Sequence, residues 1–169
     1  IEALRTRIAE TVSTSTLKAD ILSITRSYRI FALVMPQAAI AAAADRIVTM
    51  TATMSEIGAK LQARIDGAAA AGSDTSTLTE ALQSLAAHID SANANAQAAV
   101  TGTATLKSDE GDTAVAEANR AALQAAREEL RLAHEEIKAG RQDIATIIDG
   151  LKRIQASADA STDASGDTE

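Results

Sequence analysis

The chain has 169 residues, a net charge of −7 and no cysteine. The lack of cysteine excludes disulfide bonds, thiolate metal sites and cysteine catalysis, and the negative charge argues against a face that binds nucleic-acid phosphates. Alanine makes up about a quarter of the residues and only two residues are aromatic, so the composition favours helix over sheet.

Residues 1–13 are expected to form a short helical segment or the end of a preceding helix. Apolar residues recur there at helical spacing, at Ile1, Leu4, Ile8 and Val12. The serines and threonines that follow favour loops and helix caps over helix interiors. The sequence therefore predicts a break close to residue 14.

The first long helix is predicted over residues 15–35. Its apolar residues alternate spacings of four and three: Leu17, Ile21, Ile24, Tyr28, Phe31 and Met35. This spacing places them along one face, as a seam that packs against a neighbouring helix. Pro36 has no N–H and disfavours helix in the residue before it, so we expect the helix to end there.

The second helix is predicted over residues 36–70, with Pro36 in its first turn. Its seam is Ile40, Ala43, Ile47, Met50, Met54, Ile57 and Leu61. Residues 30–44 form an apolar, uncharged run that Pro36 interrupts. Since a bilayer span needs about 20 apolar residues, we expect no membrane span here.

The third helix is predicted over residues 75–100, capped by Asp74 or by a capping box of Thr77 and Glu80. Its seam is Leu78, Leu82, Leu85, Ile89, Ala92, Ala96 and Ala99. The second half of this seam is alanine, which buries less area than leucine. We expect that end of the helix to be held less firmly.

The fourth helix is predicted over residues 112–155, with Asp112 or Thr113 as its cap. Large apolar residues recur every seven positions: Leu123, Leu130, Ile137, Ile144 and Leu151. Their companions three residues further on are Ala126, Ala133, Gly140, Ile147 and Ile154. The small companions allow a neighbouring helix to approach closely, so both edges of this seam should be packed.

Residues 156–169 consist mainly of alanine, serine, threonine and aspartate, with no large apolar side chain. Such a segment buries too little surface to fold, so we predict a disordered acidic tail or a linker. Long helices joined by short turns pack as antiparallel neighbours. The fold class is therefore predicted as all-α, an elongated antiparallel up-down four-helix bundle over residues 14–155 with long heptad-patterned helices.

The residues that most often carry chemistry show no catalytic or ligand pattern. His88 and His134 have no histidine or carboxylate four residues further on, so we interpret both as surface or boundary residues. The acidic pairs 128–129 and 135–136 are interpreted as a solvated face, with Glu128 near Arg131 and Glu135 near Lys138. We therefore predict a protein that is not an enzyme and that holds no cofactor and no metal.

Three methionines, Met35, Met50 and Met54, lie at seam positions. Methionine is flexible and polarisable, so these side chains could line an adaptable apolar pocket, although methionine at seam positions is more often part of an ordinary core.

A polar residue on a seam needs a hydrogen-bond partner. For Tyr28 the candidates are Arg29, Asp45 and Arg46, which the predicted break at Pro36 would place around one corner between two helices. We expect this bond to fix the corner.

The segment Tyr-Arg-Ile-Phe-Ala-Leu-Val-Met-Pro at residues 28–36 is followed by Ala-Ala-Asp-Arg, which ends at Arg46, and later by Asp143-Ile144. With these motifs, residues 17–151 resemble a family of uncharacterised, predicted secreted helical proteins of bacteria. The resemblance implies export, a signal peptide upstream of Ile1, and a secreted or cell-surface location. It implies no activity.

These patterns predict a non-enzymatic extracytoplasmic structural or protein-interaction module that acts by packing of helix faces. A spacer, an adhesion element and a self-assembling subunit all fit this description, and only the last needs a second copy of the chain. The alternative is a carrier of an apolar small ligand, held in a methionine-lined bundle core. Another protein or a second copy is the expected partner.

Overall fold

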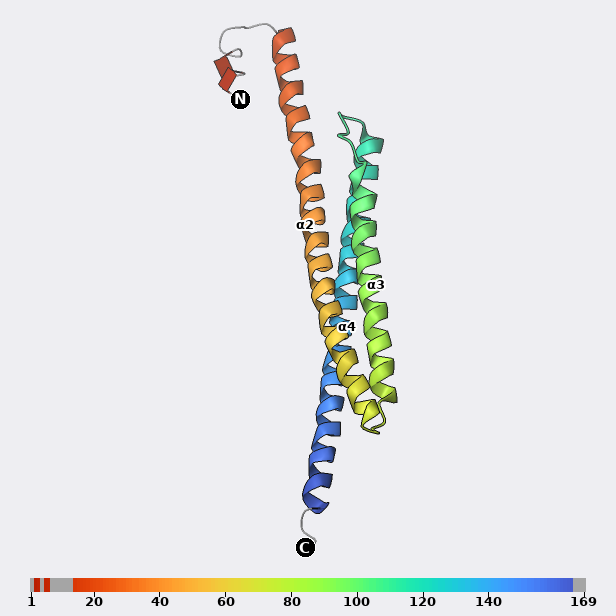
Figure 1. Ribbon diagram of the computed structural model, residues 1–169. Coiled ribbons are helices and arrows are strands. Elements are labelled where there is room, and N and C mark those ends of the chain that lie inside the picture. Colours follow the sequence, from red (N-terminus) through yellow and green to blue (C-terminus); the bar gives the residue numbers. More distant parts are fainter. Residues whose placement is uncertain (1, 4, 7–13, 166–169) are drawn as a thin grey trace.

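The computed structural model describes residues 2–3, 5–6 and 14–165, and this part of the chain contains three long helices and no strand. They are α2 (Thr14–Ala70), α3 (Ser76–Ala104) and α4 (Thr113–Ser165). In Figure 1, α3 runs back along the C-terminal half of α2, and α4 runs back along α3. The N-terminal part of α2 extends past the loop between α3 and α4, and α4 extends past the opposite end.

Three of the four predicted seams form the core. Buried residues come from the C-terminal part of α2, from α3 and from α4, and the largest fully buried side chains include Ile47, Leu85 and Ile147. The seven-residue pattern of α4 holds, because Leu130, Ala133 and Ile137 are all buried. The predicted all-α class is therefore confirmed, and the heptad spacing located the core of α3 and α4.

Close contact between the helices depends on one small residue of the α4 seam. A Cβ added to Gly140 would lie 2.6 Å from Met54 Cε and 3.1 Å from Leu85 Cδ1. These two side chains come from α2 and α3, so both other helices pack against the backbone of α4 at this point. The expectation that small seam residues permit close approach is confirmed here.

Two polar contacts set the position of α2 against α3. Gln37 Nε2 donates to the carbonyl oxygen of Thr103 over 2.7 Å, in the last turn of α3, where carbonyls lack helical partners. The buried Thr51 hydroxyl donates to Asn93 Oδ1 over 2.7 Å near the middle of both helices. Polar pairs of this kind discriminate one packing register from others, because a shifted helix would leave them unsatisfied.

Aspartates begin both later helices. Asp74 Oδ1 accepts hydrogen bonds from the backbone N–H and the hydroxyl of Ser76, and Thr75 is the N-cap residue of α3. Asp112 Oδ1 accepts from the backbone N–H groups of Ala114 and Val115 at the start of α4. Of the alternatives predicted for each helix, the structure uses Asp74 and Asp112.

The predicted helix break at Pro36 is wrong: the helices predicted over residues 15–35 and 36–70 form one helix in the described part of the chain. Pro36 lies inside α2, which is continuous from Thr14 to Ala70. The ring removes one backbone hydrogen bond, the one that the Ala32 carbonyl would accept. Leu33 before the proline and Ile40 after it are both buried. We attribute the continuity of the helix across the missing hydrogen bond to this packing.

The prediction for the C-terminus also needs correction. Helix α4 continues to Ser165, ten residues beyond the expected end, so most of the predicted disordered tail is helical. Alanine is the strongest helix former, and neither glycine nor proline interrupts the segment before Gly166. Residues 166–169 lie outside the described part, as does most of the segment predicted over residues 1–13, of which residues 2–3 and 5–6 are helical.

Candidate functional site

Eight of the ten exposed large apolar residues of the described chain lie on the N-terminal part of α2. Six of them form the seam predicted over residues 15–35, which we call the α2 seam: Leu17, Ile21, Ile24, Tyr28, Phe31 and Met35. Tyr28 is 75% exposed, Phe31 66% and Met35 65%, and the other three are about half exposed. The expectation that this seam packs inside the chain is therefore wrong.

The continuity of α2 explains why this seam is exposed. Residues two apart on a helix point to nearly opposite sides, because one turn takes 3.6 residues. Leu33 is buried at 8% exposure, whereas Met35 is 65% exposed. A break at Pro36 would have let the two seams face one core, but an unbroken helix turns the α2 seam away from α3 and α4.

A polar cluster joins α3 to α4 near the middle of the molecule. His88 Nδ1 lies 2.6 Å from Glu136 Oε2, and His88 Nε2 lies 3.7 Å from Asp143 Oδ2. A carboxylate only accepts hydrogen bonds, so Nδ1 carries the proton donated to Glu136. Asp143 Oδ2 is buried and accepts no hydrogen bond from the described residues. All three side chains are less than one-third exposed.

This cluster was missed in the sequence, where His88 was read as a surface or boundary residue. The available signal was the seven-residue spacing of Glu136 and Asp143, which places both on one side of α4. The two carboxylates lie at opposite edges of the imidazole, so they do not converge on one point as metal ligands must. In the described part of the chain, no group of three histidine, aspartate or glutamate side chains forms a metal site.

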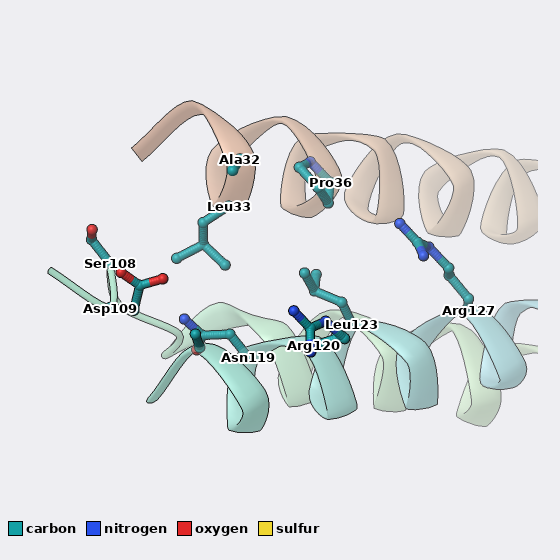
Figure 2. Close-up of a pocket in the computed structure, with 10 residues that line it drawn as sticks. Ala32, Leu33, Pro36, Ser108, Asp109, Asn119, Arg120, Leu123 and Arg127 are labelled. Atoms are coloured by element: carbon teal, nitrogen blue, oxygen red, sulfur yellow. The ribbon is translucent and has the colours of Figure 1, made fainter. Parts of the chain in front are cut away.

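A cleft of about 330 Å³ lies where α2 separates from the loop between α3 and α4. Figure 2 shows Leu33 and Pro36 of α2 on one wall and Leu123 of α4 on the other. Arg120 and Arg127 line the α4 side. Both arginines are exposed, so the cleft is an open surface feature with no buried polar group to select a ligand.

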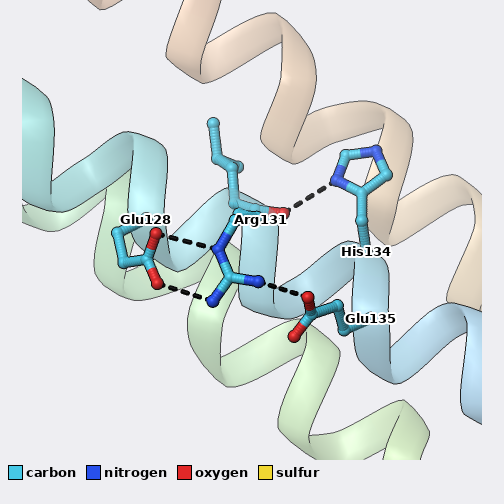
Figure 3. A network of polar contacts seen from close by, with 5 residues as sticks. Glu128, Arg131, His134 and Glu135 are labelled. Atoms are coloured by element: carbon cyan, nitrogen blue, oxygen red, sulfur yellow. Dashed lines mark hydrogen bonds and ion pairs between the residues drawn. The ribbon is translucent and has the colours of Figure 1, made fainter.

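The acidic face of α4 is a solvent-exposed ion-pair network. Figure 3 shows Arg131 between Glu128 and Glu135, with hydrogen bonds to both carboxylates. The hydrogen bonds from Arg131 hold the pKa of Glu128 below its ordinary value, and Glu128 in turn raises the pKa of Arg131. The predicted Glu128–Arg131 pair is confirmed, whereas Glu135 bonds Arg131, four residues before it, instead of Lys138.

The second histidine stays within its own helix. His134 Nδ1 lies 2.7 Å from the carbonyl oxygen of Leu130, one turn earlier in α4 (Figure 3). It is exposed, as predicted.

Two of the three predicted pocket methionines come together. Met50 and Met54 line one shallow groove between α2 and α4, together with Ile144 and Arg141, and the Arg141 guanidinium lies 3.7 Å from Met50 Sδ. Met35 belongs to the α2 seam and is not part of this groove. The methionine-lined carrier stays a prediction that the described geometry does not favour.

The predicted corner around Tyr28 does not form. Asp45 and Arg46 lie on the same continuous helix as Tyr28, at least 17 residues further along it. At 1.5 Å per residue this is a separation of about 25 Å, which no tyrosine hydroxyl spans. The side chain of Arg29 lies outside the described part of the structure.

One helical stretch, Phe31–Ala70 of α2, is long and apolar enough to cross a membrane by length and composition. The core helix of a soluble protein and a signal sequence pass the same test. The expectation of no membrane span rested partly on an interruption of the apolar run 30–44 at Pro36. The helix is continuous at Pro36, so the absence of a membrane span stays a prediction. Only 22% of the most apolar window is buried, so this helix has free apolar surface to cover.

No protein-family model matches the chain, and no curated protein or solved structure matches it. The resemblance to secreted bacterial helical proteins therefore stays an expectation drawn from residues 17–151. Within the described part of the chain, the α2 seam is the strongest candidate for a functional surface.

Proposed function

We propose that the chain is a non-enzymatic structural subunit that assembles with further copies of itself by packing helix faces. The observation that carries this proposal is the exposure of all six residues of the α2 seam. Monomeric proteins rarely expose a contiguous apolar surface of this kind, and such surfaces are typical of interaction sites. A plain spacer, by contrast, has no need of an apolar seam on its outside.

We further propose that α2, α3 and α4 form an up-down antiparallel bundle, with the α2 seam on the outer side of α2. The pairing of residues between α2 and α3 supports this arrangement. Gln37 bonds Thr103, Thr51 bonds Asn93, and Gly58 lies beside Leu85. Residue numbers fall along α3 as they rise along α2, as they do between antiparallel neighbours.

A secreted or cell-surface location completes the proposal and rests on the resemblance of residues 17–151 alone. The absence of cysteine fits a reducing and an oxidising compartment equally, so it does not bear on this location.

Thermal unfolding at several protein concentrations tests the proposed assembly. Association stabilises the folded state by mass action, so a tenfold rise in concentration should raise Tm by about 1–3 °C. Phe31→Glu places a charge in the middle of the α2 seam and should abolish this dependence. Val48→Glu alters an exposed valine of the same helix outside the seam and should preserve it.

A wild-type Tm that does not change with concentration would count against assembly. So would a concentration dependence that survives Phe31→Glu, because the contact would then lie elsewhere on the molecule.

A further inference from the structure

We infer that the α2 seam is covered by the α2 helix of a second copy, packed antiparallel over residues 17–42. This inference rests on the self-assembly proposed above and specifies its partner, direction and register. Its central element is a two-fold axis between residues 29 and 30, which places each residue of the seam opposite a defined residue of the other copy.

The sizes of the side chains along α2 are complementary in this register. The spacing of the α2 seam continues into Ala38 and Ala42, both exposed. Antiparallel pairing places Leu17 opposite Ala42 and Ile21 opposite Ala38 of the second copy. Large residues at one end therefore meet small residues at the other, which lets the two helices stay equally close along the whole contact.

The only two aromatic residues of the chain meet at the centre of this contact. Tyr28 of each copy lies opposite Phe31 of the other, and both side chains are about two-thirds exposed or more in the single chain. Aromatic pairs add attraction beyond the area that they bury. Ile24 and Met35 form the layers on either side, so the four central layers contain only large apolar residues.

The charge distribution and the area both suit such a pair. Residues 30–44 carry no charge. In the proposed register they lie opposite residues 17–29 of the second copy, which therefore meet no charged side chain there. The six side chains of the α2 seam expose on the order of 600 Å² per copy. Two copies would bury about 1,200 Å², which lies at the lower end of the range for stable interfaces.

Among the described residues, the internal packing leaves this side of α2 exposed. Leu33, Ile40 and Ala44 face α3 and α4 and are buried, whereas Met35, Ala38 and Ala42 point to the other side and are exposed. Each three-helix unit extends away from the proposed two-fold axis, because α3 accompanies only the part of α2 beyond Gln37. The partner helix would then pack on α2 alone, on the side opposite to α3 and α4.

A lipid membrane is the competing occupant, because the stretch Phe31–Ala70 is apolar enough to cross one. The spacing of the α2 seam favours a helix instead. The seven-residue spacing of the α2 seam matches one partner helix, and beside this seam Leu22 and Val34 are also exposed. In addition, Ile47 and Met54 of the same stretch are already buried against the other helices.

Disulfide trapping tests the register, and the absence of native cysteine makes single-cysteine variants clean probes. In the proposed pair, residue 21 faces residue 38 of the other copy, while the two copies of residue 21 lie about 25 Å apart. A disulfide needs Cα atoms about 6 Å apart. A mixture of Ile21→Cys and Ala38→Cys chains should therefore give at least about tenfold more covalent dimer than either chain alone.

A mixture of Ile24→Cys and Met35→Cys chains tests a second layer of the same register, and Ile21→Cys mixed with Val48→Cys is the control outside the seam. Covalent dimer in both seam mixtures, and not in the control, is the expected result. Efficient cross-linking of Ile21→Cys with itself would overturn the antiparallel direction, and failure of both seam mixtures would overturn the register.

The two proposals fail in different ways. If the wild-type chain associates but neither seam mixture cross-links, self-assembly stands and the antiparallel pairing is wrong. If the chain is monomeric and floats with vesicles of phosphatidylcholine and phosphatidylglycerol in a manner that Phe31→Glu abolishes, the α2 seam binds lipid and both proposals are wrong.

Discussion

Glu136 Oε2 of α4 lies 2.6 Å from His88 Nδ1, which lies near the middle of α3. Asp143 stands on the other side of the same imidazole, with Oδ2 3.7 Å from Nε2. His88 therefore separates two carboxylates that project from α4 seven residues apart. The hydrophobic seam holds the two helices together, and this cluster fixes their position along each other.

Replacing His88 with alanine is expected to destabilise the chain by about 1–2 kcal/mol, because Glu136 loses a hydrogen-bond donor and both carboxylates are left without the imidazole between them. Urea unfolding followed by circular dichroism measures the change. His134→Ala is the matched control, since His134 bonds only the Leu130 carbonyl within α4. Equal effects of the two substitutions would show that the His88 cluster adds nothing to the α3–α4 contact.

Gly140→Leu is expected to destabilise by about 1–3 kcal/mol or more, because the new side chain would occupy the space of Met54 and Leu85. Gly102→Leu is the control, since a Cβ at Gly102 meets nothing within 4 Å and leucine is the better helix former. Chemical denaturation of both variants should therefore show opposite signs. Similar stabilities would contradict the close approach at Gly140.

Asp74→Ala should destabilise α3 at neutral pH and lose its effect in acid. Hydrogen bonds from the Ser76 N–H and hydroxyl hold the pKa of Asp74 below its ordinary value of 3.8. A carboxylate with a lowered folded-state pKa contributes its full stability above the ordinary value, and the contribution falls as pH drops through the folded-state pKa. The unfolding free energies of wild type and variant should converge at pH values below the folded-state pKa of Asp74. A difference that persists in strong acid would contradict the role of the ionised carboxylate.

Arg131→Ala is expected to change stability much less than His88→Ala, although it removes hydrogen bonds to both Glu128 and Glu135. All three side chains are more than half exposed, and exposed ion pairs contribute little because water and salt screen them. Thermal unfolding at low and high salt measures the effect. A large loss of stability would show that the network shown in Figure 3 holds the helix in place.

The sequence was sufficient to locate most of the helices and most of the core. Heptad spacing located the buried faces of α3 and α4, including Leu85, Ala133 and Ile137. It succeeded because these helices are packed along one side only, so the period of the apolar residues directly reports the buried face.

The local helix propensity of proline predicts a break at Pro36, but the tertiary packing of α2 keeps the helix continuous there. A proline ends a helix unless packing on both sides holds the chain straight, and here Leu33 and Ile40 do so. With a break at Pro36 the α2 seam would face the core, whereas in the continuous helix it is exposed. The spacing of Leu17 to Met35 predicts a packing surface, but it does not indicate whether a partner would belong to the same chain.

The His88 cluster escaped prediction for a different reason. Its members are 48 and 55 residues apart in sequence, and they meet only because α3 and α4 pack in one particular register. The low hydrophobicity of residues 156–165 predicts disorder, but α4 continues to Ser165. An alanine-rich segment readily extends a helix that is already nucleated.

The molecular mass of the chain in solution tests the proposed self-assembly most directly. Size-exclusion chromatography with light scattering, over a concentration series, should give a wild-type mass that rises from 17.4 kDa towards twice that value. Phe31→Glu should stay at the monomer mass, and Val48→Glu should follow the wild type. A wild-type mass of 17.4 kDa at every concentration would contradict the assembly of two copies through α2.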